Sequence, residues 1–264
     1  MRLELLMSVV DFENIADIYK HVYSTNICSD VIVVNQTNFC GYEELVVNNK
    51  MCRCISMVDR GVGLSRNTAL MRTNADIAMF VDDDEVFLPG YEKYILDAFK
   101  VTPDADAIVF NVESCNDKRP SAIIKNIHRV RWYNFMRYGA YQIAIRTSSI
   151  KKKRLYFSTL FGGGCIFSSG EDSLFLSDMI DSELKIYAYP ITVATVEQKK
   201  STWFRGFDEK YFFDRGVLYS QIFRFPKLIG LIQLIRKRNV TGNELTFLDK
   251  LKSFLNGTKY EKML

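Results

Sequence analysis

Short apolar runs alternate with amphipathic segments along the first half of the chain. Runs rich in Val, Ile and Leu that end in polar or turn-forming residues predict strands, and they cover residues 5–10, 30–35, 52–58, 76–81 and 107–112. Segments with helical spacing of apolar positions lie between them, at residues 13–23, 64–74 and 90–101. This alternation predicts an α/β fold with a Rossmann-like, mostly parallel central sheet flanked by helices.

The second half is less regular. Apolar runs predict further strands at residues 143–146, 185–189 and 191–196. From about residue 201 the pattern is helical, aromatic and basic. We therefore expect an α/β domain over residues 1–200, built of halves 1–115 and 116–200, and a helical basic and aromatic C-terminal extension over residues 201–264.

Composition narrows the class of protein. Of 264 residues, 48% are hydrophobic and 25% are charged, which is typical of a folded domain with a large core. No apolar run reaches the roughly 18 residues of a membrane span, and the first residues do not resemble a secretory leader. The six cysteines have neither the CxxC spacing of a metal site nor a matching histidine cluster. We expect a cytoplasmic protein with reduced thiols.

Four consecutive acids follow the predicted strand at residues 76–81, in the sequence Phe80-Val81-Asp82-Asp83-Asp84-Glu85. Alternation along a strand places Asp82 and Asp84 on one side and Asp83 on the other. Like charges packed behind an apolar strand are costly unless a cation lies among them, and oxygen ligands suit Mg²⁺ or Mn²⁺. A solvated acidic turn is the alternative.

Two glycine-flanked helix starts add further candidates. Gly61-Val62-Gly63-Leu64 precedes Arg66, and a helix N-terminus with an arginine in its first turn favours an anion such as a diphosphate. Gly162-Gly163-Gly164 precedes Gly170-Glu171-Asp172. Acids in a first helical turn also have a purely structural explanation, because they complement the helix dipole.

Together these segments resemble one family. Phe80 to Gly90 resembles the "DxD then PG" signature of family 2 glycosyltransferases of the GT-A fold. Gly63 to Leu70 resembles the family's block upstream of that signature, and Asp30 to Asn38 its second-strand block. Glu171-Asp172 resembles its "ED" motif. The order and spacing match over residues 1 to about 200, and the resemblance is greatest to bacterial enzymes that build capsular and other surface polysaccharides.

The resemblance implies a reaction and its partners. The expected reaction is inverting transfer of a sugar from a nucleotide diphosphate sugar, most simply a UDP-sugar, to a hydroxyl group. The acceptor is expected to be a glycan or a polyprenyl-diphosphate-linked glycan in surface polysaccharide synthesis. Residues 1–115 would form the nucleotide-binding half and residues 116–200 the acceptor half. No nucleic-acid partner is expected.

The resemblance also assigns roles to residues. Asp84 and Asp82 would hold Mn²⁺ or Mg²⁺. Asp172 would be the catalytic base, with Glu171 beside it, and we expect the helix N-terminus to lower the pKa of Asp172 and keep it ionised. Contacts with the nucleotide sugar are expected from five residues: Asn35, Arg66, Asp82, Asp83 and Gly163.

The C-terminal extension has an excess of basic residues. Residues 201–264 contain 12 Lys or Arg and 6 Asp or Glu, and residues 224–238 contain five basic residues and no acid around an apolar run. This combination favours an anionic membrane surface, such as the inner face of the cytoplasmic membrane. A basic helix packed on the core is the alternative. Trp203, Phe204 and Tyr211 are candidates for stacking on an acceptor sugar.

Two other classes of function remain open. A sugar nucleotidyltransferase also uses paired acids and a divalent metal, but it would show a glycine- and arginine-rich loop after the first strand, where this chain has Met7-Ser8-Val9-Val10-Asp11. A catalytically silent protein that binds a glycan or a partner enzyme is the second. The presence of Asp82, Asp84 and Asp172 argues against a silent protein.

Overall fold

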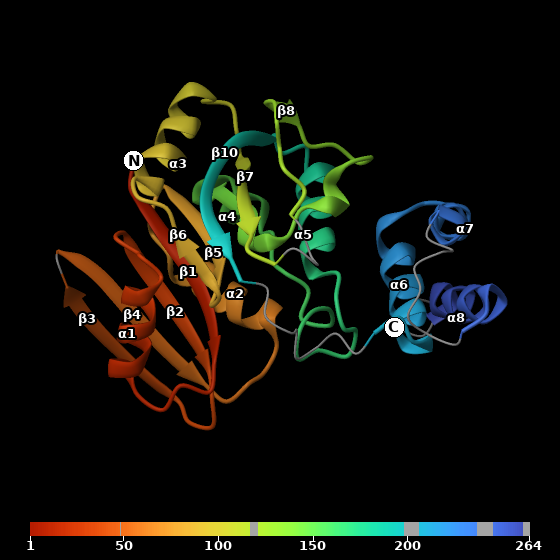
Figure 1. The fold of residues 1–264 in the computed structure, drawn as a ribbon, viewed down its shortest axis with the longest axis horizontal. Helices are drawn as coiled ribbons and strands as arrows, with labels where there is room; N and C mark the ends of the chain where they lie inside the picture. Colours follow the sequence, from red (N-terminus) through yellow and green to blue (C-terminus); the bar gives the residue numbers. More distant parts are fainter. Residues whose placement is uncertain (48, 117–120, 198–205, 237–244, 261–264) are drawn as a thin grey trace.

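The chain folds around one central sheet with helices on both faces (Figure 1). The computed structural model describes residues 1–47, 49–116, 121–197, 206–236 and 245–260. In that part of the chain the strands follow the order β3-β4-β2-β1-β5-β9-β7-β10-β6, and β8 pairs with β10. The strands are β1 (Leu3–Val10), β2 (Asp30–Gln36), β3 (Gly41–Val47), β4 (Lys50–Met57), β5 (Ile77–Asp82), β6 (Glu85–Phe87), β7 (Ala107–Ser114), β8 (His128–Arg129), β9 (Ile143–Arg146) and β10 (Ile186–Val196).

The strands β4, β2, β1 and β5 form a parallel block of the sheet, and β7 pairs in parallel with β10. Ser8 of β1 is in register with Val34 of β2 and with Asp82 of β5, so the polar ends of these strands meet at one edge. The predicted α/β fold with a central sheet flanked by helices is confirmed. The whole sheet is mixed, because β9 lies antiparallel between β5 and β7, and β3 and β6 are antiparallel edge strands.

Two features of the sheet differ from the strands predicted from the sequence. The runs predicted as separate strands at 185–189 and 191–196 form the single strand β10, whose pairing with β7 shifts register between Ala188 and Thr192. Pro190 explains the shift, because proline cannot donate to the ladder. The exposed seven-residue strand β3 and the short strands β6 and β8 were not predicted, since none of them has a run of buried apolar residues.

The helices cover both faces of the sheet. They are α1 (Ile15–Ser24), α2 (Val62–Arg72), α3 (Tyr91–Val101), α4 (Thr147–Lys153) and α5 (Glu171–Asp181), with single turns η1 (Phe135–Arg137) and η2 (Ala140–Gln142). Apolar residues of α1 and α3 pack in one core with alternate residues of β1, such as Leu5 and Met7. Residues of α2, α4 and α5 pack in a second core with Leu6. Burial on both faces explains why β1 reads as a continuous apolar run.

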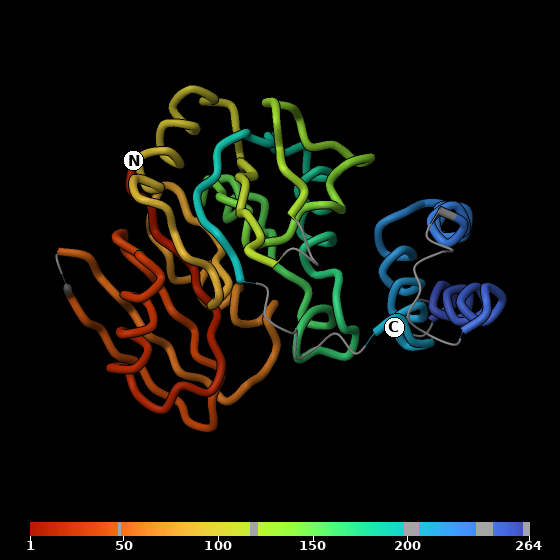
Figure 2. Tube along the Cα trace, in the orientation of Figure 1, coloured from red at the N-terminus to blue at the C-terminus, as the bar shows by residue number. Residues whose placement is uncertain are grey.

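The C-terminal extension is helical where the structure describes it. It comprises α6 (Glu209–Ile222), α7 (Pro226–Arg236) and α8 (Phe247–Tyr260), which lie side by side next to the main domain (Figures 1 and 2). A third hydrophobic core joins these helices to Phe161 and Phe167 of the loop before α5. The extension is therefore packed against the segment that leads into α5.

The buried carboxylate of Asp214 hydrogen-bonds α6 to the loop before α5. Asp214 is 3% exposed, and its Oδ2 accepts hydrogen bonds from the backbone N–H (2.9 Å) and hydroxyl (2.9 Å) of Ser168 and from Lys210 Nζ (2.6 Å). Next to this contact Gly170 has φ +125°, and a Cβ there would lie 2.7 Å from the Leu218 methyl carbons. Asp214 thus holds α6 against the residues that begin α5.

We predict that Asp214→Ala lowers the free energy of unfolding by about 1–3 kcal/mol, because two partly buried donors of Ser168 lose a buried, charged acceptor. Urea denaturation measures the change. Asp97→Ala is the matched control, since Asp97 pairs with Lys100 on an exposed helix surface, and this substitution should leave the free energy of unfolding nearly unchanged. Equal small losses in both variants would contradict the role given to Asp214.

Candidate active site

The candidate site lies at the edge where β1, β2 and β5 end. Asp82 is the last residue of β5, residues 83 and 84 form a turn, and Glu85 begins β6. Strand alternation therefore stops at Asp82 and does not set the direction of Asp84, contrary to the expectation from the sequence. Asp83 is exposed, Asp82 and Asp84 are half-buried, and the backbone oxygen of Asp83 lies 2.8 Å from Nε2 of His21.

Arg66 brings the acids of two distant segments together. Its guanidinium donates to Asp82 Oδ1 (2.9 Å) at the end of β5, and to Glu171 Oε1 (3.1 Å) and Asp172 Oδ1 (3.0 Å) in the first turn of α5. The Arg66 side chain is 4% exposed and packs on the Phe157 ring, 5.4 Å from its centroid. The predicted metal-binding strand end and the predicted "ED" pair thus form one cluster around a buried cation.

The electrostatics of Arg66 follow from this arrangement. Burial acts to lower the pKa of Arg66, but the carboxylates of Asp82, Asp172 and Glu171 outweigh burial and raise the pKa. The guanidinium stays charged and is bonded to carboxylates. In this structure Arg66 therefore organises the acids. Its predicted contact with the nucleotide sugar would add to that role.

Asp172 has an unusual environment for a carboxylate at a helix N-terminus. Burial first, and then the neighbouring Glu171 carboxylate, raise the pKa of Asp172 to about 8, against the lowering effects of Arg66 and of the Ala140 N–H. The expectation that the helix N-terminus would lower this pKa is wrong, because burial among like charges outweighs the dipole. The Asp172 side chain keeps 28% exposure, so a substrate group can reach it.

Two further residues at the site were missed from the sequence. Glu85 is completely buried, and its Oε1 accepts the backbone N–H of Asp82 at 2.7 Å. Burial, followed by the Asp82 carboxylate, raises the pKa of Glu85 well above its ordinary value. Burial raises the pKa of Tyr141 to about 12, and the Glu85, Asp82 and Asp172 carboxylates contribute. The run of four acids gave no sign that its last member is buried.

Asn35 lies in β2 near the edge where β1, β2 and β5 end, but its side chain is turned inward. It is completely buried, its Oδ1 accepts from the Phe12 backbone N–H (3.2 Å), and its Nδ2 donates to the Phe12 carbonyl (2.9 Å). Nδ2 also donates to Ser56 Oγ at 3.3 Å. Asn35 therefore holds the loop after β1. Its predicted contact with the nucleotide sugar stays a prediction.

The triple glycine packs against the start of α2. The carbonyl of Gly163 accepts the N–H of Val62 at 3.0 Å, so the first amide of the helix is capped by this loop. Gly162 has φ +108°, and a Cβ there would lie 2.6 Å from Val62 Cγ1 and 2.8 Å from Glu171 Cδ. The glycines thus permit a close approach between α2 and α5. That approach brings Arg66 near Glu171.

The described residues do not form a complete metal centre by themselves. No group of three or more His, Cys, Asp or Glu side chains in the described ranges is arranged to hold an ion. Asp82 is 38% exposed at the mouth of the cluster, and Asp84 follows it in the turn. The end of β5 thus provides two carboxylates, those of Asp82 and Asp84, as oxygen ligands.

Comparison with solved structures identifies the fold. The structure of S. aureus TarS 1-349 in complex with UDP-GlcNAc matches with a TM-score of 0.64 and 10% identity, over 100% of this chain and 92% of that chain. A second structure of TarS 1-349 matches with a TM-score of 0.57 and 14% identity, over 99% and 72%. A structure of S. aureus TarS matches at 0.58 and 14%, over 97% of this chain and 43% of that chain. At such identities the likeness shows a common fold.

Sequence comparison finds a family similarity over part of the chain. No curated protein sequence matches this chain. The model of glycosyl transferase family 2 matches residues 40–164, which include the start of α2, Arg66, the acids at the end of β5 and the triple glycine. This chain therefore has the GT-A fold, and its residues 40–164 are similar to glycosyl transferase family 2.

Proposed function

We propose that this protein transfers a sugar, with inversion at the anomeric carbon, from a UDP-sugar to a hydroxyl of a glycan or polyprenyl-diphosphate-linked acceptor in surface polysaccharide synthesis. The observation that carries the proposal is the Arg66 cluster, which joins Asp82 at the strand end to Asp172 of α5. The UDP and UDP-GlcNAc complexes of TarS support a uridine donor. Asp83 at the exposed turn, and the loop of Gly163, would face the nucleotide sugar.

The acids at the end of β5 fit a divalent cation. The side chains of Asp82, Glu171 and Asp172 carry more negative charge than Arg66 balances when all three are ionised. Mg²⁺ and Mn²⁺ are commonly held by one or two carboxylates together with substrate phosphate oxygens. Asp84 and Asp82 would hold such an ion with the donor's diphosphate. When bound, the ion would offset the charge that develops on the leaving diphosphate.

Asp172 would act as the catalytic base. Its carboxylate would accept the proton of the acceptor hydroxyl while the hydroxyl oxygen forms a bond to the anomeric carbon. The bond from that carbon to the diphosphate oxygen breaks on the opposite face, which inverts the configuration. Arg66 would fix the orientation of the Asp172 carboxylate, and Glu171 would share that contact. General-base catalysis of this kind contributes roughly 10²–10⁴-fold to the rate.

Donor hydrolysis tests the proposal. With a panel of nucleotide sugars and Mn²⁺, we expect the wild type to release one nucleotide diphosphate slowly, and Asp84→Ala to abolish the release because the diphosphate loses its cation. Asp172→Asn should bind that nucleotide with unchanged affinity but lose transfer to an acceptor by at least about 10²-fold. Chromatography of released nucleotide and calorimetric titration measure the two effects.

Asp97→Asn, an exposed carboxylate on α3, is the matched control and should behave as wild type. Absence of both turnover and nucleotide binding with every donor would contradict the proposal and favour a catalytically silent glycan- or partner-binding protein. Formation of a nucleotide sugar from a sugar phosphate and a nucleoside triphosphate would favour a sugar nucleotidyltransferase.

The raised pKa of Asp172 sets the expected pH dependence. A base must be unprotonated, so kcat/KM should fall about tenfold for each pH unit below an apparent pKa near 8 and level off above it. Initial rates between pH 5.5 and 9.5 measure the profile, and nucleotide affinity at each pH separates binding from chemistry. A flat profile from pH 6 to 9 would argue against Asp172 as the base.

We also propose that α7 rests on an anionic membrane from the cytoplasmic side. Phe225, Leu228, Ile232 and Ile235 follow the 3–4 spacing of one helix face, and each is between 47% and 63% exposed. Arg224 and Lys227 are exposed beside this face, and the basic residues 237 and 238 lie outside the described residues. An apolar face with flanking cations is typical of helices that lie in a lipid interface. No helix among the described residues is long and apolar enough to cross a bilayer.

Substitution of this face gives a direct test. The double variant Leu228→Glu with Ile232→Glu should reduce sedimentation with phosphatidylglycerol-containing vesicles at least about tenfold, because it removes buried apolar area and adds like charge. Val101→Glu with Met71→Glu, which changes two exposed apolar residues of α3 and α2, is the matched control. Equal sedimentation of the two double variants would contradict the proposal.

A further inference from the structure

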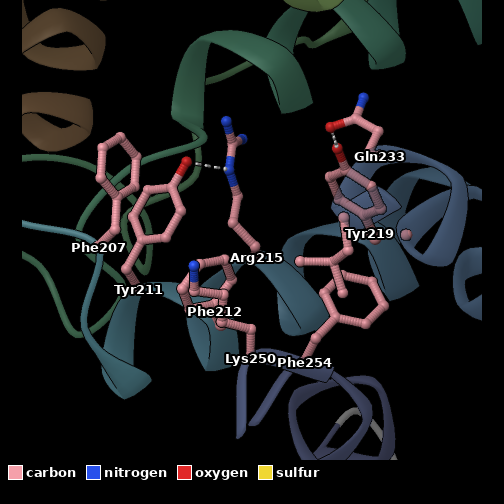
Figure 3. A pocket seen from close by; sticks show the side chains of 10 residues that line it. Phe207, Tyr211, Phe212, Arg215, Tyr219, Gln233, Lys250 and Phe254 are labelled. Atoms are coloured by element: carbon pink, nitrogen blue, oxygen red, sulfur yellow. Dashed lines mark hydrogen bonds between the residues drawn. The ribbon is translucent and has the colours of Figure 1, made fainter. Parts of the chain in front are cut away.

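The pocket around Arg215 in the C-terminal extension is too small for an organic ligand. It lies among α6, α7 and α8, where Arg215 and Lys250 line it together with aromatic rings such as those of Tyr211 and Phe254 (Figure 3). Its volume is about 50 Å³, which leaves room for water but not for a sugar ring or a nucleotide. This pocket is a feature of helix packing. A larger unused surface lies at the opposite end of the molecule.

That surface is the outer edge of β3. In the described part of the chain β3 is the terminal strand of the sheet, at the end of the molecule away from the extension (Figures 1 and 2). Its seven residues pair with β4 in unbroken antiparallel register, from Gly41 opposite Ser56 to Val47 opposite Lys50. The other side of β3 therefore presents backbone N–H and C=O groups that no described strand pairs.

β3 lacks the features that usually protect such an edge. Proteins protect exposed edges with lysines, prolines, bulges or very short strands. Residues 41–47 contain no lysine and no proline, and their register with β4 has no bulge. Tyr42, Leu45 and Val46 are instead 58%, 37% and 59% exposed. The charges of the strand are two acids, Glu43 and Glu44. These properties favour the addition of a further strand at this edge.

The two acids select the register in which a second copy can pair. Residues of an antiparallel strand bond alternately to the neighbours on its two sides, so a two-fold pair of β3 strands is centred on one residue. Three centres pair at least five residues of each strand: Glu43, Glu44 and Leu45. The first two place an acid directly opposite itself, which is unfavourable. Centring on Leu45 places Glu44 opposite Val46 and Glu43 opposite position 47, so no acid faces an acid.

We infer that this chain forms a symmetric dimer in which the β3 strands of two copies pair antiparallel about Leu45, so that the two sheets become one continuous sheet. Backbone hydrogen bonds supply the attraction, and Leu45 packs on Leu45 of the second copy while Val46 packs on Glu44. An interface of one strand pair is small, so the dimer is weak and reversible. It leaves α7, at the other end of the molecule, uncovered (Figure 1). The inference does not depend on the proposed transfer reaction.

Charge substitutions at position 46 test the inference. Sedimentation velocity should show a wild-type monomer that converts to dimer as its concentration rises from about 1 to about 100 µM. Val46→Glu places an acid opposite Glu44 twice in the dimer and should weaken dimerisation at least about tenfold, whereas Val46→Lys creates two opposite-charge pairs and should dimerise at least as tightly as wild type. Val101→Glu, the same change at an exposed position of α3, should dimerise as wild type.

Oxidation of an introduced cysteine gives an independent test. The pairing places the Cα atoms of residue 45 in the two copies about 4.5–5.5 Å apart, a distance that a disulfide spans. Mild oxidation should therefore convert Leu45→Cys to a covalent dimer. Val46→Cys, whose two copies would lie diagonally apart, should give no more dimer than the wild type, whose own exposed cysteines supply the background.

Each outcome bears on the inference. A wild type that is monomeric at every concentration would overturn it and leave this edge to a strand of another protein. Equal weakening by Val46→Glu and Val46→Lys would overturn the register, because in a pairing about Glu44 both substitutions face Tyr42. More covalent dimer from Val46→Cys than from Leu45→Cys would do the same. If thermal unfolding shows that Val46→Glu is misfolded, the oxidation of Leu45→Cys decides the result. No nucleotide sugar is present in these experiments, so their failure leaves the proposed reaction untouched.

Discussion

The buried guanidinium of Arg66 is the contact on which the site depends. Its hydrogen bonds to Asp82, Glu171 and Asp172 join the end of β5 to the start of α5, more than 80 residues later in the chain. Without this cation, three carboxylates would face one another in a poorly solvated space, which is strongly unfavourable. The same charge opposes the rise in the pKa of Asp172. One side chain thus sets both the geometry and the protonation of the acidic cluster.

The surrounding structure serves to keep this cluster in place. Glycine at position 162 lets α2 and α5 approach closely, and the buried Glu85 accepts the backbone N–H of Asp82. On the other side, Asp214 bonds α6 to Ser168, four residues before Asp172. The extension is therefore part of the support of the loop that leads to the candidate base. This arrangement explains why a helical segment outside the sheet shares a hydrophobic core with Phe161 and Phe167.

The extension presents two different surfaces. The outer face of α7 is apolar with flanking cations, as expected of a helix at a lipid interface, whereas the pocket around Arg215 combines cations with aromatic rings. Both follow from the basic and aromatic composition of residues 201–264.

The sequence alone determined the α/β alternation, the run of acids at the end of a strand and the "ED" pair, because strand and helix periods and local motifs are properties of neighbouring residues. Only the tertiary structure decided which groups are buried there. Burial raises the pKa of Asp172 and Glu85, turns Asn35 toward Phe12 and directs Arg66 to carboxylates. Desolvation and charge pairing depend on residues far apart in the chain, so no local pattern could reveal them.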